Sequence, residues 1–223
     1  MKNGFLKRTA AVVLTIIMSI SGVVEPKAAT GSTIKLFGIH DKNTMFTHTD
    51  YRCMWMKEGG SRYRKADPTA TIKKKHYARA NSVYASMKGS DYIIIKTHGS
   101  YNSITLFDKK DDKLVQTTLW DSTIKNGPRL DRLKLCFVMA CNSWNMARTI
   151  QEQGAKATIG FRNQIHAEPG ASMLNQFNKS FTSKSQKTLA SAMYDAKVAV
   201  HRDFPGYKEL DNYEIYGWAS QLF

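Results

Sequence analysis

Three short stretches of the chain are almost entirely apolar and do not alternate with polar residues. They are DYIIIKT at 91–97, LKLCFVMA at 133–140 and KATIGF at 156–161. Apolar runs of this length are typical of strands buried on both faces, as in a parallel sheet. A fourth stretch, TIKLFGI at 33–39, is predicted as the first strand of the same sheet.

Between these strands the apolar positions recur at helical spacing. One helix is predicted to begin at Asp67, with Pro68 in its first turn, and to end at Gly89. A second is expected over 143–153, and two amphipathic helices follow the loop RNQIHAEPG at 162–170. Strands that alternate with helices predict an α/β fold with a mostly parallel sheet.

Other segments complete this outline. SITLF and KLVQT on either side of DKKDD are predicted to form a β-hairpin, and YEIYGW near the C-terminus is predicted as a last strand. Residues 40–66 give no clear pattern and are left unassigned. Because no repeat, low-complexity segment or Pro/Gly linker divides residues 30–223, we expect them to form one domain.

The N-terminus is typical of an export signal. Lys2, Lys7 and Arg8 precede an apolar run over 10–24, which is short for a membrane span. We predict a signal peptide over 1–29 and a secreted or cell-surface protein. An uncleaved N-terminal anchor is the alternative, because the residues ahead of Ala28 and Ala29 do not form a clear cleavage motif.

The chain is strongly basic, with 33 Lys and Arg against 18 Asp and Glu and a net charge of +15. Without residues 1–29 it would keep 29 basic and 17 acidic residues. Such a charge favours anionic surroundings such as cell-surface polymers. We find no nucleic-acid-binding motif, and the basic residues are scattered apart from KKKH at 73–76. A solvated basic surface explains most of them.

Two residues suited to catalysis follow the buried strands directly. His98 comes after the first apolar run and Cys141 after the second. In open α/β sheets reactive groups collect beyond the carboxyl ends of the strands, so we expect the imidazole and the thiol to face one another there. Three cysteines are an odd number for an exported chain, so at least one thiol should be free or paired with another molecule.

A Cys–His pair at this position is suited to nucleophilic catalysis. The thiolate is the reactive form, and both a nearby imidazole and the N-terminus of the helix predicted after Cys141 favour it. The thiolate would attack a carbonyl carbon while His98 gives a proton to the leaving amine. The backbone N–H groups of Gly99 and Cys141 are candidates to stabilise the oxyanion.

These residues also carry a family resemblance. YIIIKTHG, LKLCFVMACNS and GAKATIGF resemble, in order and spacing, the caspase-like (clan CD) cysteine peptidases, with the strongest likeness to CHAT domains. The resemblance covers roughly residues 90–217. It implies a caspase-like three-layer α/β/α sandwich, a catalytic dyad of Cys141 and His98, and cleavage of peptide bonds in protein or peptide substrates. Together with the predicted signal peptide, this predicts an exported cysteine endopeptidase, for which we expect no cofactor.

In the family, two segments border the pocket for the residue before the cut. They correspond here to FRNQIH at 161–166 and FVMA at 137–140. The resemblance therefore implies substrate contacts from Met139, Phe161 and Arg162, with no carboxylate among them. On this basis we expect poor cleavage after Arg or Lys. His166 either borders the substrate cleft or is an ordinary solvent-exposed loop residue.

Several other functions are disfavoured. No G-x-S-x-G, P-loop or H-E-x-x-H motif occurs. His40, His48 and Cys53 do not have the spacing of a zinc site, and no metal is expected. Cys136 lies within a predicted strand and is expected in the core. The alternative to a peptidase is a catalytically silent caspase-like domain that binds a partner or an anionic surface.

Overall fold

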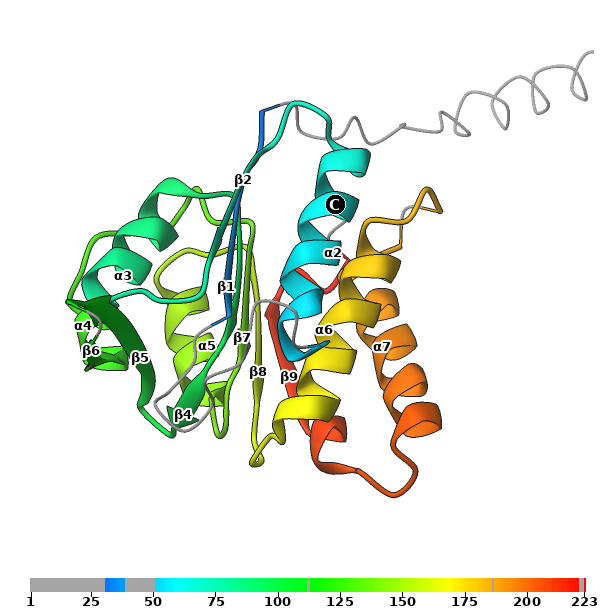
Figure 1. Ribbon diagram of the computed structural model, residues 1–223. Coiled ribbons are helices and arrows are strands. Elements are labelled where there is room, and N and C mark those ends of the chain that lie inside the picture. Colours follow the sequence, from blue (N-terminus) through cyan, green and yellow to red (C-terminus); the bar gives the residue numbers. More distant parts are fainter. Residues whose placement is uncertain (1–30, 39–50, 112, 186, 221–222) are drawn as a thin grey trace, which may run out of the picture.

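The computed structural model describes residues 31–38, 51–111, 113–185, 187–220 and 223 (Figure 1). The strands are β1 (Thr33–Gly38), β2 (Thr71–Lys75), β3 (Tyr92–Lys96), β4 (His98–Ser100), β5 (Ser103–Lys110), β6 (Lys113–Trp120), β7 (Leu135–Met139), β8 (Ala157–Phe161) and β9 (Tyr213–Gly217). The helices are α2 (Tyr51–Ala66), α3 (Ala80–Gly89), α4 (Asp121–Lys125), α5 (Trp144–Glu152), α6 (Ala167–Phe181), α7 (Leu189–Asp203) and the short 3₁₀ helix η1 (Glu209–Asp211).

Six strands form the central sheet in the order β2-β1-β3-β7-β8-β9. The first five run parallel, and β9 pairs antiparallel with β8 at one edge. β4, β5 and β6 form a separate three-stranded antiparallel sheet. The predicted α/β fold with a mostly parallel sheet is confirmed.

Helices cover both faces of the central sheet. In Figure 1, α2, α6 and α7 lie on one side, while α3, α4, α5 and the small sheet lie on the other. The side chains of β3 show how the sequence produces this arrangement. Tyr92 and Ile94 belong to the core under the first set of helices, and Ile93 and Ile95 to the core on the second side. A strand in the middle of three layers buries both faces, which explains its uninterrupted apolar run.

The helix predicted from Asp67 to Gly89 is wrong over its first half. Residues 71–75 form β2, and only Ala80–Gly89 is helical. Asp67 does not cap a helix. Its Oδ1 accepts hydrogen bonds from the backbone N–H and the hydroxyl of Thr69, at 3.0 and 2.7 Å, which stabilises a turn instead.

The histidine strand also differs from expectation. The main-sheet strand β3 ends at Lys96, and His98 begins β4 of the small sheet. The predicted hairpin is confirmed as β5 and β6, and β4 adds a third strand to it.

None of the helices within the described ranges combines the length and the apolar character needed to cross a bilayer. The signal peptide predicted over 1–29, the segment 39–50 and the side chain of Cys53 lie outside the described part of the chain.

Candidate active site

His98 and Cys141 follow two strands that are neighbours in the main sheet. β3 and β7 pair in parallel as far as Lys96 and Met139. The backbone N–H of Thr97 then donates to the carbonyl oxygen of Met139 at 3.1 Å. The two chains therefore leave the sheet side by side, with His98 and Cys141 in the segments that follow. The predicted neighbour relation of these strands is confirmed.

The backbone of Gly99 lies directly against that of Cys141. A side chain at position 99 would place its Cβ 2.6 Å from the carbonyl oxygen of Cys141 and 2.8 Å from the Cβ of Ala140. Real Cβ contacts are longer than this, so the close approach requires glycine. The His98–Gly99 pair is thus held next to Cys141 by backbone packing.

Cys141 is a free, half-buried thiol. The backbone N–H of Ile165 donates to its sulfur at 3.2 Å, and the sulfur lies 3.8 Å from the carbonyl oxygen of the same residue. Such an N–H donor can stabilise negative charge that develops on the sulfur during a reaction. Cys136 is also free but fully buried in the core, as predicted, and burial raises the pKa of its thiol.

A tight turn joins Cys141 to α5. Asn142 has a φ of +50°, in the left-handed region, which asparagine tolerates better than most residues. The buried hydroxyl of Ser143 donates to the carbonyl of Val138 at 2.8 Å and accepts from the N–H of Phe161 at 3.2 Å. These bonds tie the turn to β7 and β8. Because α5 starts at Trp144, the positive end of its dipole lies within three residues of the thiol.

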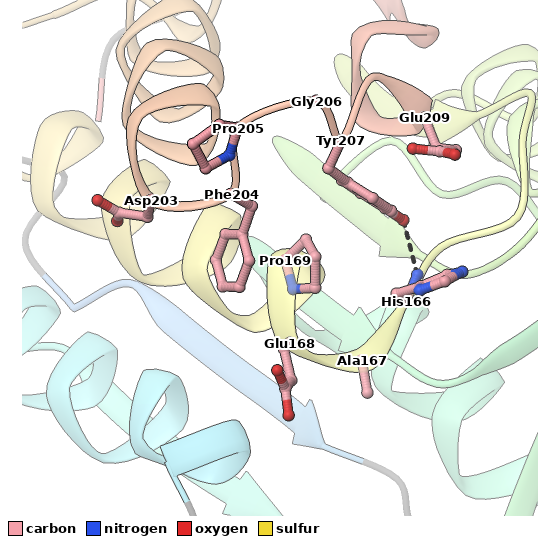
Figure 2. Close-up of a pocket in the computed structure, with 10 residues that line it drawn as sticks. All are labelled: His166, Ala167, Glu168, Pro169, Asp203, Phe204, Pro205, Gly206, Tyr207 and Glu209. Atoms are coloured by element: carbon pink, nitrogen blue, oxygen red, sulfur yellow. Dashed lines mark hydrogen bonds between the residues drawn. The ribbon is translucent and has the colours of Figure 1, made fainter.

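A pocket of about 800 Å³ begins at His166, the residue after the one that bonds the thiol (Figure 2). Its described lining consists of His166, Ala167, Glu168, Pro169, Asp203, Phe204, Pro205, Gly206, Tyr207 and Glu209. Figure 2 shows the ring of Pro169 from α6 and the rings of Phe204 and Tyr207 from the connection after α7 around the hollow. Three of the ten residues carry carboxylates, and none is a lysine or an arginine.

Tyr207 connects this pocket to the thiol. Its hydroxyl accepts a hydrogen bond from the backbone N–H of His166 at 2.7 Å (Figure 2). Burial raises the pKa of Tyr207, and the negative charges of Glu209 and of a Cys141 thiolate act in the same direction. Residues 165–166 therefore contact both the thiol and a residue of the pocket lining.

The residues predicted to contact substrate have different surroundings. Met139 and Phe161 are 1% and 0% exposed and pack within the core, so their side chains add no surface to the pocket. Arg162 is exposed. Its Nε bonds to Glu214 of β9 at 2.6 Å, and its guanidinium stacks on the ring of Trp144 at 4.5 Å. The contacts of Arg162 thus lie with β9 and α5 instead of with the pocket lining.

The sequence left the role of His166 open and did not indicate the rest of the pocket. His166 is exposed and lines the hollow, so it borders the candidate site. Tyr207 and Glu209 lie more than 60 positions after Cys141, in the connection from α7 to β9. A Pro-Gly pair at 205–206 marks a loop there. No local sequence pattern predicts that this loop packs beside the start of α6.

No group of three or more His, Cys, Asp or Glu side chains in the described part of the chain is arranged to hold a metal ion. The described hydrogen bonds at Cys141 come from the backbone of Ile165, and the phenol of Tyr207 bonds the next residue, His166.

Comparison with solved structures finds the same architecture in known cysteine peptidases. The Arg-specific cysteine proteinase gingipain R matches with a TM-score of 0.63 and 11% identity, covering 85% of this chain and 47% of its own. The complex of the pro- and mature domains of Porphyromonas gingivalis RgpB matches with a TM-score of 0.63, 12% identity and coverages of 85% and 48%. The fold is that of the caspase-like peptidases.

The yeast separase–securin complex extends this caspase-like similarity. It matches with a TM-score of 0.55 and 10% identity over 86% of this chain and 12% of its own. The chain thus spans about half the length of the gingipain chains and a small part of separase. No family model and no curated protein matches the sequence. At these identities the likeness concerns the fold.

Proposed function

We propose that the protein is a cysteine endopeptidase of the CHAT type, with Cys141 as nucleophile and His98 as general acid and base. The contact of Gly99 with the backbone of Cys141 carries this proposal, because it places the histidine-bearing strand against the cysteine at the carboxyl edge of a caspase-like sheet. The Ile165 N–H on the sulfur and the helix that starts at Trp144 support a reactive thiolate.

The proposed reaction has two halves. The Cys141 thiolate attacks the carbonyl carbon of a peptide bond, a carbon–sulfur bond forms, and the carbonyl oxygen becomes an oxyanion. The N–H groups of Gly99 and Cys141 are the proposed donors to this oxygen. As the carbon–nitrogen bond breaks, the His98 imidazolium gives its proton to the leaving amine. Water then attacks the thioester carbon while His98 accepts a proton from the water. The carbon–sulfur bond breaks, the carboxylic acid product is released, and Cys141 is again a thiolate.

The pocket beside Cys141 is the proposed binding site for a substrate side chain near the cut. The expected rejection of basic residues rested on segments without carboxylates. The pocket lining instead includes Glu168, Asp203 and Glu209, of which Asp203 is paired with Arg202, in a protein that otherwise has an excess of basic residues. Opposite charges attract across such a hollow, so we propose that a basic side chain is accepted there and an acidic one disfavoured.

We further propose that the protein acts outside the cell, either secreted or at its surface. The basic n-region and apolar run within residues 1–29 support export. The net charge of +15 supports attraction to anionic polymers at the cell surface.

The experiment for the proposed activity is digestion of a diverse peptide library by the purified protein, with Cys141→Ala as the blank. We expect cuts that the variant does not make. A protein that makes no cuts and whose Cys141 reacts with iodoacetamide no faster than an ordinary exposed thiol would instead be the silent binding domain.

A further inference from the structure

His98 does not belong to the sheet that carries Cys141. It lies on β4, and β4 pairs with β5 in the separate three-stranded sheet. Besides the backbone contact of Gly99 with Cys141, the relative position of imidazole and thiol therefore depends on how that small sheet is held against the turn and helix that follow β7. Contacts between the β4–β5 turn and α5 hold these two parts of the chain together.

The side chain of Asn145 in α5 bonds to residues at both chain ends of the β5–β6 hairpin. Its side-chain Nδ2 donates to Oδ1 of Asn102 at 2.9 Å and to Oδ2 of Asp121 at 3.0 Å. Asn102 lies in the β4–β5 turn, and Asp121 follows β6 directly. The backbone N–H of Asp121 also donates to the carbonyl of Asn102 at 2.9 Å. An amide nitrogen carries two hydrogens, so Asn145 uses both of them to hold the hairpin.

A ring contact runs beside this network. Tyr101, in the same turn, packs edge-to-face on Trp144 with ring centroids 5.2 Å apart and an interplanar angle of 71°. Arg162 stacks on the same indole at 4.5 Å and is bonded to Glu214. Tyr101 is 52% exposed, so this contact orients the turn without burying it in the core.

We propose that Trp144 and Asn145 are positioning residues that hold the small sheet of β4, β5 and β6 so that His98 meets Cys141. The inference rests on the proposed cysteine peptidase function. Both residues stand in the first turn of the helix that begins three positions after Cys141. One helical turn therefore fixes the thiol through the preceding loop and the imidazole through the hairpin.

The test compares single and double variants of the full chain, with His98→Ala as the reference for a missing imidazole. Asn145→Ala and Asn102→Ala remove the same hydrogen bond from its two ends, and Asn102 is exposed, so its loss leaves the core intact. Trp144→Ala removes the ring on which Tyr101 packs, and Trp144→Phe keeps an aromatic ring there. Trp218→Ala is the matched control, because this tryptophan is 63% exposed and also lies next to a cation, Lys156.

Two properties are measured: kcat and KM for a cleaved peptide, and the pH profile of Cys141 alkylation by iodoacetamide. Misplaced catalytic groups lower the rate of the chemical step, so we expect Asn145→Ala and Asn102→Ala each to lose about tenfold or more in kcat with little change in KM. Their alkylation profiles should approach that of His98→Ala. The Asn102→Ala/Asn145→Ala double variant should be no slower than Asn145→Ala, which already lacks the bonds to both Asn102 and Asp121. Trp144→Ala should lose kcat, Trp144→Phe should retain more of it, and Trp218→Ala should stay near wild type.

The alkylation profile keeps this test separate from the peptidase proposal, because it needs no substrate. If no peptide is cut, profiles of Asn145→Ala and Asn102→Ala that shift toward that of His98→Ala still support the positioning role. Folded Asn145→Ala and Asn102→Ala proteins with the wild-type profile would overturn it. An alkylation profile that is the same with and without His98 would overturn it as well.

Discussion

The backbone N–H of Ile165 donates a hydrogen bond to the sulfur of Cys141 at 3.2 Å. The two residues belong to different connections of the sheet, since Cys141 follows β7 and Ile165 follows β8. This bond places the loop that leads to the acidic pocket directly beside the thiol. The thiol and the proposed substrate pocket therefore both border the loop that follows β8.

Gly99→Ala should damage both stability and activity. The added methyl group would lie 2.6 Å from the Cys141 carbonyl oxygen, so the backbone must move. Overpacking of this kind costs about 1–3 kcal/mol in the free energy of unfolding. Chemical denaturation and peptide cleavage are the measurements. Gly89→Ala is the control, because a Cβ there meets nothing within 4 Å; equal effects of the two changes would contradict the proposed contact.

Cys141 and Cys136 should differ sharply in reactivity in the native protein. Cys136 is fully buried, and burial raises the pKa of its thiol, so it stays protonated and shielded near neutral pH. Cys141 is partly exposed with an N–H donor on its sulfur. Peptide mapping after brief iodoacetamide treatment should find the label on Cys141 and none on Cys136 until denaturant is added. Equal labelling of both thiols before unfolding would be incompatible with this structure.

Arg162→Ala should leave cleavage selectivity unchanged. Its guanidinium is engaged by Glu214 and Trp144 and does not line the acidic pocket. Matched peptides that differ only in one side chain near the cut provide the measurement.

Glu209→Gln should instead reduce the preference for a basic over an acidic side chain, because it removes one of the pocket carboxylates. The turnover of the same matched peptides measures this preference. A selectivity that changes with Arg162 but not with Glu209 would reverse the assignment.

Asp195 should stabilise the contact of α6 with α7 in a pH-dependent way. The ammonium of Lys187, followed by the hydroxyl of Ser180, holds the pKa of Asp195 below its ordinary value of 3.8. A depressed folded-state pKa contributes stability above 3.8, and this contribution is lost as the pH falls through the folded-state value. Asp195→Asn should therefore lower the free energy of unfolding at neutral pH, with a gap that narrows in strong acid.

Denaturation at several pH values measures this gap. Asp131→Asn, whose pair with Arg129 is exposed on both sides, should have little effect at any pH. A gap for Asp195→Asn that does not change with pH would show that the carboxylate charge is not the cause.

The main sheet and the strands that precede His98 and Cys141 were accessible from the sequence because each depends on local pattern. YIII at 92–95 and LCFVM at 135–139 are buried on both faces and need no distant information to be recognised as strands. The failure at 67–79 has the opposite cause. Asp67 and Pro68 are typical of a helix start, but pairing of 71–75 with β1, about 38 positions earlier, favours a strand.

The pocket was not predictable for a similar reason. Its walls come from α6, the end of α7 and the loop before β9, and only their packing brings Glu168, Asp203 and Glu209 together. Segments next to Cys141 and β8 in sequence supplied Met139 and Phe161 as candidates. Both side chains turned inward, because the strands that carry them are covered on both faces.

The most direct test of the account is the rate of peptide cleavage by Cys141→Ala and His98→Ala, compared with the wild-type protein. Both replacements lie at or beyond the strand ends and remove little from the core, so far-UV circular dichroism should show wild-type folding. We predict that each variant loses cleavage while Trp218→Ala retains it. A folded Cys141→Ala protein that cuts the same bonds at the wild-type rate would contradict the assignment of Cys141 as the nucleophile.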